Sequence, residues 1–307
     1  MNPEDKKAGR FYCNFKVHKE HDHIPSPRPI ISGSGSITEN IGLFVEHHIK
    51  HIATTHDTFI EDTPGFLRCI SKLNKGPLLN PHTLLVTWDV IGLFTNIKHS
   101  EGLDTLREAL EKRKNIKVPT SYLIELMELL LKQNIFEFHE SLWKQEVGAA
   151  MGSRPIPAYA NIFMAKIDAL IKVIARKYSE KNCEALTLFK RFLDDYISLF
   201  VGTTKNLHKL LDEINSINPS IQLTMNHTST ENESPKDSCN CEKKALNPIL
   251  RHPIEYYRWQ NRCRSLQKKN RSKSILTSKQ LPQQDDHSLN TILTELENRE
   301  DLYKPLK

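Results

Sequence analysis

The 307-residue chain lacks the clustered cysteines of a disulfide-rich protein, because its six cysteines are scattered. They stand at positions 13, 69, 183, 239, 241 and 263, without the dense, regular spacing of a disulfide framework. We therefore expect reduced thiols and an intracellular protein. Neither the cysteines near position 240 nor the histidines at 18, 21 and 23 have the spacing of zinc ligands, so the sequence does not predict a structural zinc ion.

Long apolar runs are also missing. No apolar stretch approaches the length that crosses a membrane, and residues 1–10 are polar and charged, so the sequence predicts neither a membrane span nor a signal peptide. The chain has no internal repeat. Its 38% hydrophobic and 26% charged residues are typical of a soluble globular protein with polar segments, and its length suits one large domain or two ordinary ones.

The net charge of +6 is unevenly distributed along the chain. Residues 251–273 alone carry a net charge of +7, with Tyr256, Tyr257 and Trp259 among the Lys and Arg residues. This segment is either a nucleic-acid arm, whose cations contact phosphates while its aromatic rings stack on bases, or a solvated basic tail. Residues 227–250 before it are polar with few apolar side chains, which predicts a linker.

Hydrophobic periodicity predicts a mixture of helices and strands in the first 226 residues. Helices are expected over 37–54, 64–73, 101–114, 121–133, 158–178 and 207–217. Strands are expected over 84–89, 135–138, 143–145 and 221–225, with a hairpin over 188–201. The proline-rich stretch from residue 25 to 29 excludes helix and favours an extended chain.

Two adjacent carboxylates, Asp194 and Asp195, interrupt the apolar run that predicts the hairpin. They are either part of an ordinary surface turn, where Asp is common, or the ligands of a divalent metal ion. The predicted strand over 84–89 also ends in an acid, Asp89, and a Gly/Ser/Pro loop at 148–157 leads into the longest predicted helix. Two-metal phosphoryl transfer requires carboxylates from separate strands that converge on one spot. Asp89 and Asp194 would meet that requirement.

The order of these segments resembles the palm of a reverse transcriptase, specifically that of the Penelope-like retroelement group, which is related to telomerase. Leu85–Ile97 is similar to that group's first catalytic motif, Gly148–Asn161 to its template-handling motif, and Lys190–Ile197 to its double-Asp motif. Three further blocks are similar to the next palm segment and to the fingers motifs that grip the incoming triphosphate: 211–225, 12–19 and 28–30.

This resemblance implies an α+β fold of the reverse-transcriptase right-hand type. An antiparallel palm sheet would pack on helices, with partial fingers and no recognisable thumb. The implied division is partial fingers over 1–80, a palm over 81–226, the polar linker over 227–250, and a disordered or helical basic tail over 251–307.

The resemblance also implies an RNA-directed DNA polymerase that uses two Mg²⁺ ions, with Mn²⁺ as a substitute. Its partners would be an RNA template, a DNA primer and deoxynucleoside triphosphates. Asp89 and Asp194 would bind both ions, and Asp195 would assist. The other implied roles are triphosphate contact by Lys16 and Arg28, phosphate contact by the backbone amides of Val90 to Leu93, exclusion of a ribose 2′-hydroxyl by Phe94, and shaping of the template and base-pair pocket by Gly152, Ser153 and Pro157.

The sequence departs from the group's pattern at several points. Gly92 stands where the group usually has Ser, and Lys98 where it usually has Pro. The strand motif that leads to the thumb is missing from position 228 onward, and the group's GIY-YIG endonuclease pattern is absent. The chain is therefore expected to be a truncated or decayed copy, which leaves a catalytically inactive nucleic-acid-binding remnant as an alternative function.

A third interpretation is a helical interaction protein in which the Asp pair is only a turn. Elements of the resembled group insert into chromosomes, so the nucleus is the expected location. The basic cluster at 268–273 is the one segment similar to a nuclear signal.

Overall fold

The computed structural model contains two compact units, and the chain passes between them more than once. One unit comprises residues 1–55, 92–166 and 280–307, and the other comprises 56–91 and 167–279. The structure describes residues 7–15, 27–77, 79–80, 82–114, 116–179, 184–228 and 303–305. Among these residues, no helix has both the length and the apolar character that a membrane span requires. The units do not follow the predicted bounds of fingers and palm, and that functional division stays a prediction.

The first unit contains a five-stranded sheet with the strand order β2-β1-β4-β5-β9. Its strands are β1 (Gly9–Phe15), β2 (Pro27–Ser32), β4 (Ile135–Phe138), β5 (Ser141–Gln145) and β9 (Tyr303–Pro305). Neighbouring strands are antiparallel except for β1 and β4, which are parallel. His139 and Glu140 join β4 to β5 with positive φ at both positions, as in a type I′ hairpin turn. Phe11, Phe136 and Trp143 belong to the hydrophobic core of this unit.

The helices of the first unit follow the predicted apolar spacing. They are α1 (Glu39–Ala53), α3 (Leu93–Asn96), α4 (His99–Glu111), α5 (Thr120–Lys132) and the first half of α6 (Ile156–Ala175). The buried face of α5 consists of Leu123, Ile124, Met127, Leu130 and Leu131, which recur at helical spacing. The prediction of a helix over 121–133 is therefore confirmed.

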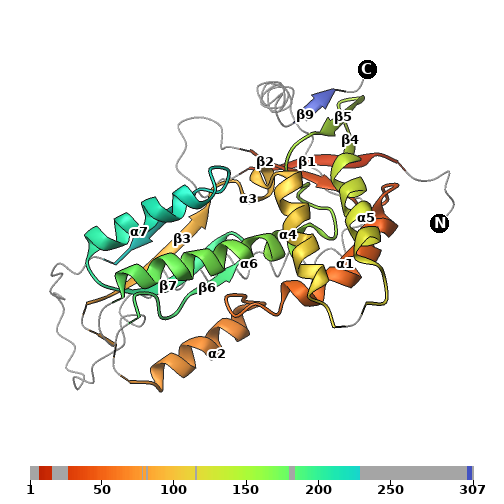
Figure 1. Cartoon of the computed structure of the whole chain (residues 1–307). Helices are drawn as coiled ribbons and strands as arrows, with labels where there is room; N and C mark the ends of the chain where they lie inside the picture. Colours follow the sequence, from red (N-terminus) through yellow and green to blue (C-terminus); the bar gives the residue numbers. More distant parts are fainter. Residues whose placement is uncertain are drawn as a thin grey trace. The chain divides into compact units, whose positions relative to one another are not determined.

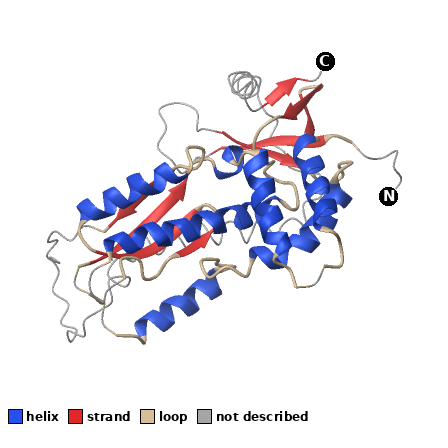
Figure 2. Ribbon diagram, in the orientation of Figure 1, coloured by secondary structure: helices blue, strands red, loops and turns tan. Residues whose placement is uncertain are grey.

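The second unit contains a four-stranded antiparallel sheet with the order β6-β7-β3-β8 (Figures 1 and 2). Its strands are β3 (Thr83–Val90), β6 (Lys190–Phe192), β7 (Asp195–Val201) and β8 (Leu223–His227). Its helices are α2 (Thr63–Asn74), α7 (Thr204–Ile217), the second half of α6 and a short 3₁₀ helix (Arg176–Tyr178). Asp62 begins α2 by accepting a hydrogen bond from the backbone N–H of Gly65 at 2.8 Å, which satisfies one amide of the first turn.

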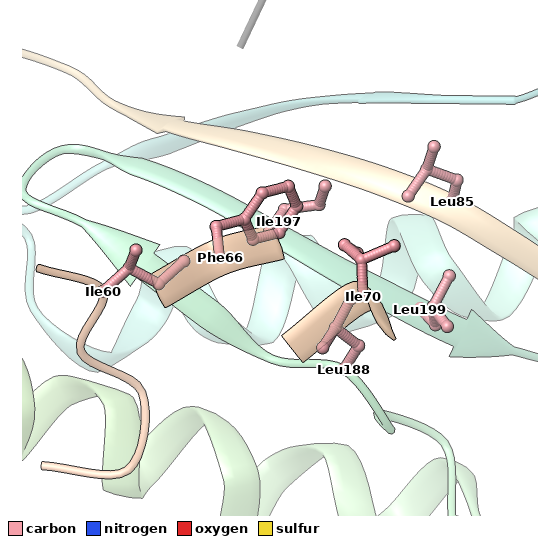
Figure 3. Close-up of a cluster of buried hydrophobic side chains, with 7 residues drawn as sticks. All are labelled: Ile60, Phe66, Ile70, Leu85, Leu188, Ile197 and Leu199. Carbon is pink, nitrogen blue, oxygen red and sulfur yellow. The ribbon is translucent and has the colours of Figure 1, made fainter. Parts of the chain in front are cut away.

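Alternation along the strands gives this sheet two different faces. On one face, Leu85, Ile197 and Leu199 pack with Phe66 and Ile70 of α2 in a buried apolar cluster (Figure 3). The other face carries Trp88, Tyr196 and Ser198, and the indole N–H of Trp88 donates to the Ser198 hydroxyl at 2.8 Å. Both faces of the central strands are therefore buried over most of their length.

The observed elements match the predicted helices and strands to within a few residues at most ends. The tail differs from its prediction at residues 303–305, which form a strand paired with β5 rather than helix or disordered chain. The predicted linker beyond residue 228 and the basic segment 251–273 lie outside the described residues.

Candidate functional site

The predicted hairpin forms, and its tip is a two-residue turn. Phe192 and Asp195 are paired across β6 and β7, which leaves Leu193 and Asp194 as the loop. Leu193 has a φ of 56°, whereas Asp194 is not among the residues with positive φ. Positive φ at the first loop position alone is the pattern of a type II′ turn. A leucine is strained in this conformation, so the surrounding structure must hold the turn in place.

The three predicted acids lie on adjoining stretches of backbone. Asp89 is directly opposite Asp195 in the antiparallel pairing of β3 and β7, and directly opposite residues on one face have Cβ atoms roughly 4.5–5.5 Å apart. The backbone N–H of Val90 donates to the carbonyl oxygen of Asp194 at 3.0 Å, which ties the turn to the end of β3. All three acidic residues are half-buried.

The face that carries Asp89 and Asp195 is the face that carries the apolar cluster. Asp89 follows Leu85 by four positions on β3, and Asp195 precedes Ile197 by two on β7, so strand alternation gives them the same side. The cluster gives the acids a buried support on both strands. This fits the expected arrangement of carboxylates from separate strands on a rigid sheet.

The acids have the chemistry for a hard divalent cation, because carboxylate oxygens are the ligands that Mg²⁺ and Mn²⁺ prefer. Among the described residues, however, no group of three or more His, Cys, Asp and Glu side chains is close enough to hold a metal ion. The backbone arrangement therefore fits a carboxylate site, while the side chains are not gathered into a ligand set.

The backbone amides of Val90 and Ile91, next to Asp89, are already hydrogen-bonded within the second unit. Val90 was predicted to contact nucleotide phosphate through its amide, but that N–H donates to Asp194 and the residue is buried. The N–H of Ile91 is also engaged, with the carbonyl oxygen of Gln222 at 2.8 Å. Both amides are bonded to backbone carbonyls, so the prediction of phosphate contact is left only for the amides of Gly92 and Leu93.

A buried polar network lies on the opposite face of the sheet, behind the hairpin. The Nε of Arg191 donates to both carboxylate oxygens of Asp168 in α6, at 3.2 and 3.0 Å. The phenol of Tyr196 and the hydroxyl of Thr58 also donate to this carboxylate, each at 2.6 Å. The guanidinium of Arg191 lies 5.7 Å from the centre of the Tyr196 ring. Burial, reinforced by the Asp168 charge, raises the pKa of Tyr196 well above its usual value.

The sequence did not indicate a role for this network. Its one signal was the presence of charged residues in apolar surroundings, Asp168 within a largely apolar helix and Arg191 within the apolar hairpin run. Charges in such positions are almost never fully buried without a partner.

The remaining described site residues lie in the first unit, whereas Asp89, Val90, Asp194 and Asp195 lie in the second. Lys16 is outside the described residues. Arg28 is half-buried in β2, opposite Asn14 of β1. Ser153 is half-buried, and Pro157 is exposed in the first turn of α6.

The glycine loop of the first unit is fixed to two neighbouring segments. The N–H of Ala149 donates to the carbonyl oxygen of Phe94 at 2.6 Å, and the N–H of Ile31 donates to that of Met151 at 2.8 Å. Gly152 has a φ of 120°, and a Cβ there would lie 2.4 Å from the Ile31 carbonyl oxygen. Only glycine fits such an approach. The loop therefore joins the half-buried Phe94 to strand β2, which also carries Arg28.

No protein-family model matches the chain, and no curated protein matches its sequence. Solved structures of telomerase are nevertheless similar to it in fold. The structure of telomerase from Candida albicans, in complex with a TWJ fragment of telomeric RNA, is 9% identical with a TM-score of 0.53 and aligns over 76% of this chain and 43% of its own. Apo telomerase from Candida tropicalis is 11% identical with a TM-score of 0.53, over 74% and 44%.

The chain thus has a polymerase-type fold like that of telomerase, and it spans less than half the length of those telomerase chains. The prediction of a mixed α+β polymerase fold is confirmed at this level. The narrower assignment to the Penelope-like group stays a prediction, as do the site residues.

Proposed function

We propose that the chain is the catalytic part of an RNA-directed DNA polymerase from a Penelope-like retroelement. It extends the 3′-hydroxyl of a DNA primer with deoxynucleotides, copies an RNA template and acts in the nucleus. The observation that carries this proposal is the pairing of Asp89 with Asp195, together with the bond from Val90 to the Asp194 carbonyl, in a telomerase-like fold. Together they supply acids from two strands at one point of a rigid sheet.

Asp89, Asp194 and Asp195 would hold two Mg²⁺ ions, and Mn²⁺ would substitute. When bound, such ions lower the pKa of the attacking primer hydroxyl and neutralise negative charge on the triphosphate. The chain's own contribution is position, because β3 and β7 hold two of the acids opposite each other. In this proposal Arg28 and Lys16 bind the triphosphate through their positive charges.

Template and nucleotide selection are assigned to the first unit. Phe94 rejects the ribose 2′-hydroxyl, and Gly152, Ser153 and Pro157 shape the template and base-pair pocket. The bonds that fix the loop from Gly148 to Ser153 support this role, because a pocket that selects a base pair requires a wall of defined position.

The second candidate is a catalytically inactive remnant that binds nucleic acid. One sequence feature favours it: the strand motif that leads to the thumb is missing from position 228 onward. A helical interaction protein, by contrast, does not account for the two β-sheets or the telomerase-like fold.

Primer extension tests the proposal directly. The purified chain is mixed with an RNA template, an annealed DNA primer, Mg²⁺ and deoxynucleotides, and the products are resolved by length. We expect extension by the wild type, far slower extension by Asp194→Asn, and unchanged extension by Asp212→Asn, whose residue is exposed on α7. A wild-type chain that binds the template but adds no nucleotide would contradict the polymerase and support the remnant.

A further inference from the structure

We infer that Arg191 and Asp168 are positioning residues, which hold the Leu193–Asp194 turn at the distance from Asp89 that the proposed reaction needs. The catalytic consequence rests on the proposed function, whereas the positioning of the turn does not.

The Arg191 side chain reaches both helix α6 and the hairpin turn. Its Nε binds Asp168, and its Nη1 donates to the carbonyl oxygen of Leu193 at 3.1 Å. Leu193 is the turn residue with the strained positive φ. One guanidinium therefore connects a helix to the tip of the hairpin, and its planar shape fixes both contacts at once.

Arg191 is itself immobilised. Its backbone N–H donates to the carbonyl oxygen of Thr58 at 2.7 Å, and its own carbonyl oxygen accepts from the N–H of Ile60 at 2.9 Å. The Thr58 hydroxyl then binds the same Asp168 carboxylate. The Asp168–Arg191 pair is thus closed into a network by both backbone and side chain, and such a network confines its members to one arrangement.

The turn is linked by a backbone hydrogen bond to the residue that follows Asp89. The Asp194 carbonyl oxygen accepts the N–H of Val90, the residue that follows Asp89. Since a strained turn moves to a relaxed conformation when its supports are removed, loss of the Leu193 contact should release the Asp194 carbonyl from Val90. The amide of Val90 therefore reports on the position of the turn.

The network cannot itself be part of the metal site, because it is on the wrong face. Tyr196 lies one residue after Asp195 on β7, so its side chain points to the opposite side of the sheet. Asp168 binds Tyr196 and Arg191 on that side and is almost completely buried. Asp168 and Arg191 therefore act through the turn rather than by contact with a substrate.

Hydrogen exchange at the Val90 amide, measured by NMR, separates positioning from plain stability. Arg191→Lys keeps the charge opposite Asp168 and removes the fork that reaches Leu193. Tyr196→Phe is the second variant, because it keeps the ring volume and loses only the bond to Asp168. Ser198→Ala is the matched control, since it removes a buried hydrogen bond on the same strand and face, away from the turn.

We expect Arg191→Lys to speed Val90 exchange at least tenfold relative to other amides of the β3–β7 pairing, and Tyr196→Phe to do so to a smaller extent. Ser198→Ala should change all these amides together. The opposite outcome is that, in both Arg191→Lys and Tyr196→Phe, the exchange rate of the Val90 amide rises only as much as that of the neighbouring amides in β3 and β7. In that case Arg191 and Asp168 merely stabilise the fold, and the inference is overturned.

Primer extension adds the catalytic readout. With an active wild type, Arg191→Lys should lower kcat at least tenfold while KM for deoxynucleotide and affinity for the template stay the same. An inactive wild type with selective Val90 exchange would overturn the proposed function and leave the positioning intact. The inference alone would be overturned by a third outcome. In that outcome the wild type is active, Arg191→Lys leaves kcat unchanged, and the Val90 amide exchanges no faster than the other amides of the β3–β7 pairing.

Discussion

The carboxylate of Asp168 accepts the Nε–H of Arg191 at 3.0 Å, with only 3% and 1% of the two side chains exposed. The pair lies behind the hairpin that carries Asp194 and Asp195. Two charges removed from water at this depth are stable only together, because either one alone would keep its full desolvation cost. Helix α6, which carries Asp168, also carries Lys172, which forms an ion pair with Asp57, and Asp57 is 79% exposed. One ion pair on this helix is therefore buried, and the other is open to solvent.

The first prediction compares these two pairs. Asp168→Ala should lower the free energy of unfolding by about 3–5 kcal/mol, because it leaves the Arg191 charge buried and unpaired. Asp57→Ala should lower it by less than about 1 kcal/mol, because solvent already screens that pair. Urea unfolding at pH 7 measures both values. Equal losses in the two variants would show that the buried pair has no special weight.

The second prediction concerns two buried tyrosines with different surroundings. The Tyr196 phenol donates to Asp168, whereas the Tyr159 phenol has no hydrogen-bond partner in the described part of the chain. Tyr196→Phe should cost about 1.5–3 kcal/mol of unfolding free energy, as for a hydrogen bond to a charged group. Tyr159→Phe should cost nothing or stabilise the fold, since it removes a buried hydroxyl without a partner. Chemical unfolding of the two variants side by side tests the difference, and a larger loss in Tyr159→Phe would contradict it.

The third prediction is a pH dependence that follows from the same phenol. Burial and the Asp168 charge raise the pKa of Tyr196 well above 10, so the folded chain keeps this proton when the unfolded chain has lost it. The contribution of Tyr196 to stability is therefore complete below pH 10 and declines as the pH rises above that value. The stability gap between wild type and Tyr196→Phe should narrow from pH 9 to pH 11, as measured by urea unfolding. A constant gap would contradict the raised pKa.

The fourth prediction compares two glycines with positive φ. Gly152 has a carbonyl oxygen 2.4 Å from the position of a Cβ, whereas Gly35 has nothing within 4 Å. Gly35→Ala should cost about 1 kcal/mol from backbone strain alone, and Gly152→Ala at least about 3 kcal/mol because the β2 backbone must also move. The midpoint of thermal unfolding ranks the variants. Equal shifts would mean that the loop is not held against β2 as closely as the hydrogen bond from Ile31 to Met151 implies.

Much of the fold could be predicted because its signals are local. The spacing of apolar residues predicts helix α5, and the apolar run around Asp194 and Asp195 predicts the hairpin. The resemblance of the motif order to a reverse-transcriptase palm implied that Asp89 and Asp194 converge. The register that sets Asp195, rather than Asp194, opposite Asp89 was not expected.

The parts that could not be predicted depend on contacts between distant residues. Nothing in β1 or β9 indicates that one pairs with β4 in parallel and the other with β5. The use of the Val90 amide is similarly hidden, because it depends on where the Asp194 carbonyl lies across the sheet. The sequence shows Asp168 and Arg191 only as charged residues within apolar segments. It does not show that these two residues pair with each other.

The fifth prediction separates the roles of the two hairpin acids. The family resemblance implies that Asp194 is the shared metal ligand and that Asp195 supports it, whereas the strand pairing sets Asp195 directly opposite Asp89. Asp194 lies in the turn, where its carbonyl already binds Val90. If Asp194 is the shared ligand, Asp194→Asn should lower kcat more than about 100-fold and Asp195→Asn only about 10- to 100-fold, the range for a residue that supports a metal ligand. Single-nucleotide extension at several Mn²⁺ concentrations measures both kcat and the apparent metal affinity. The reverse ranking, with the larger loss of metal affinity in Asp195→Asn, would transfer the shared-ligand role to the residue that faces Asp89.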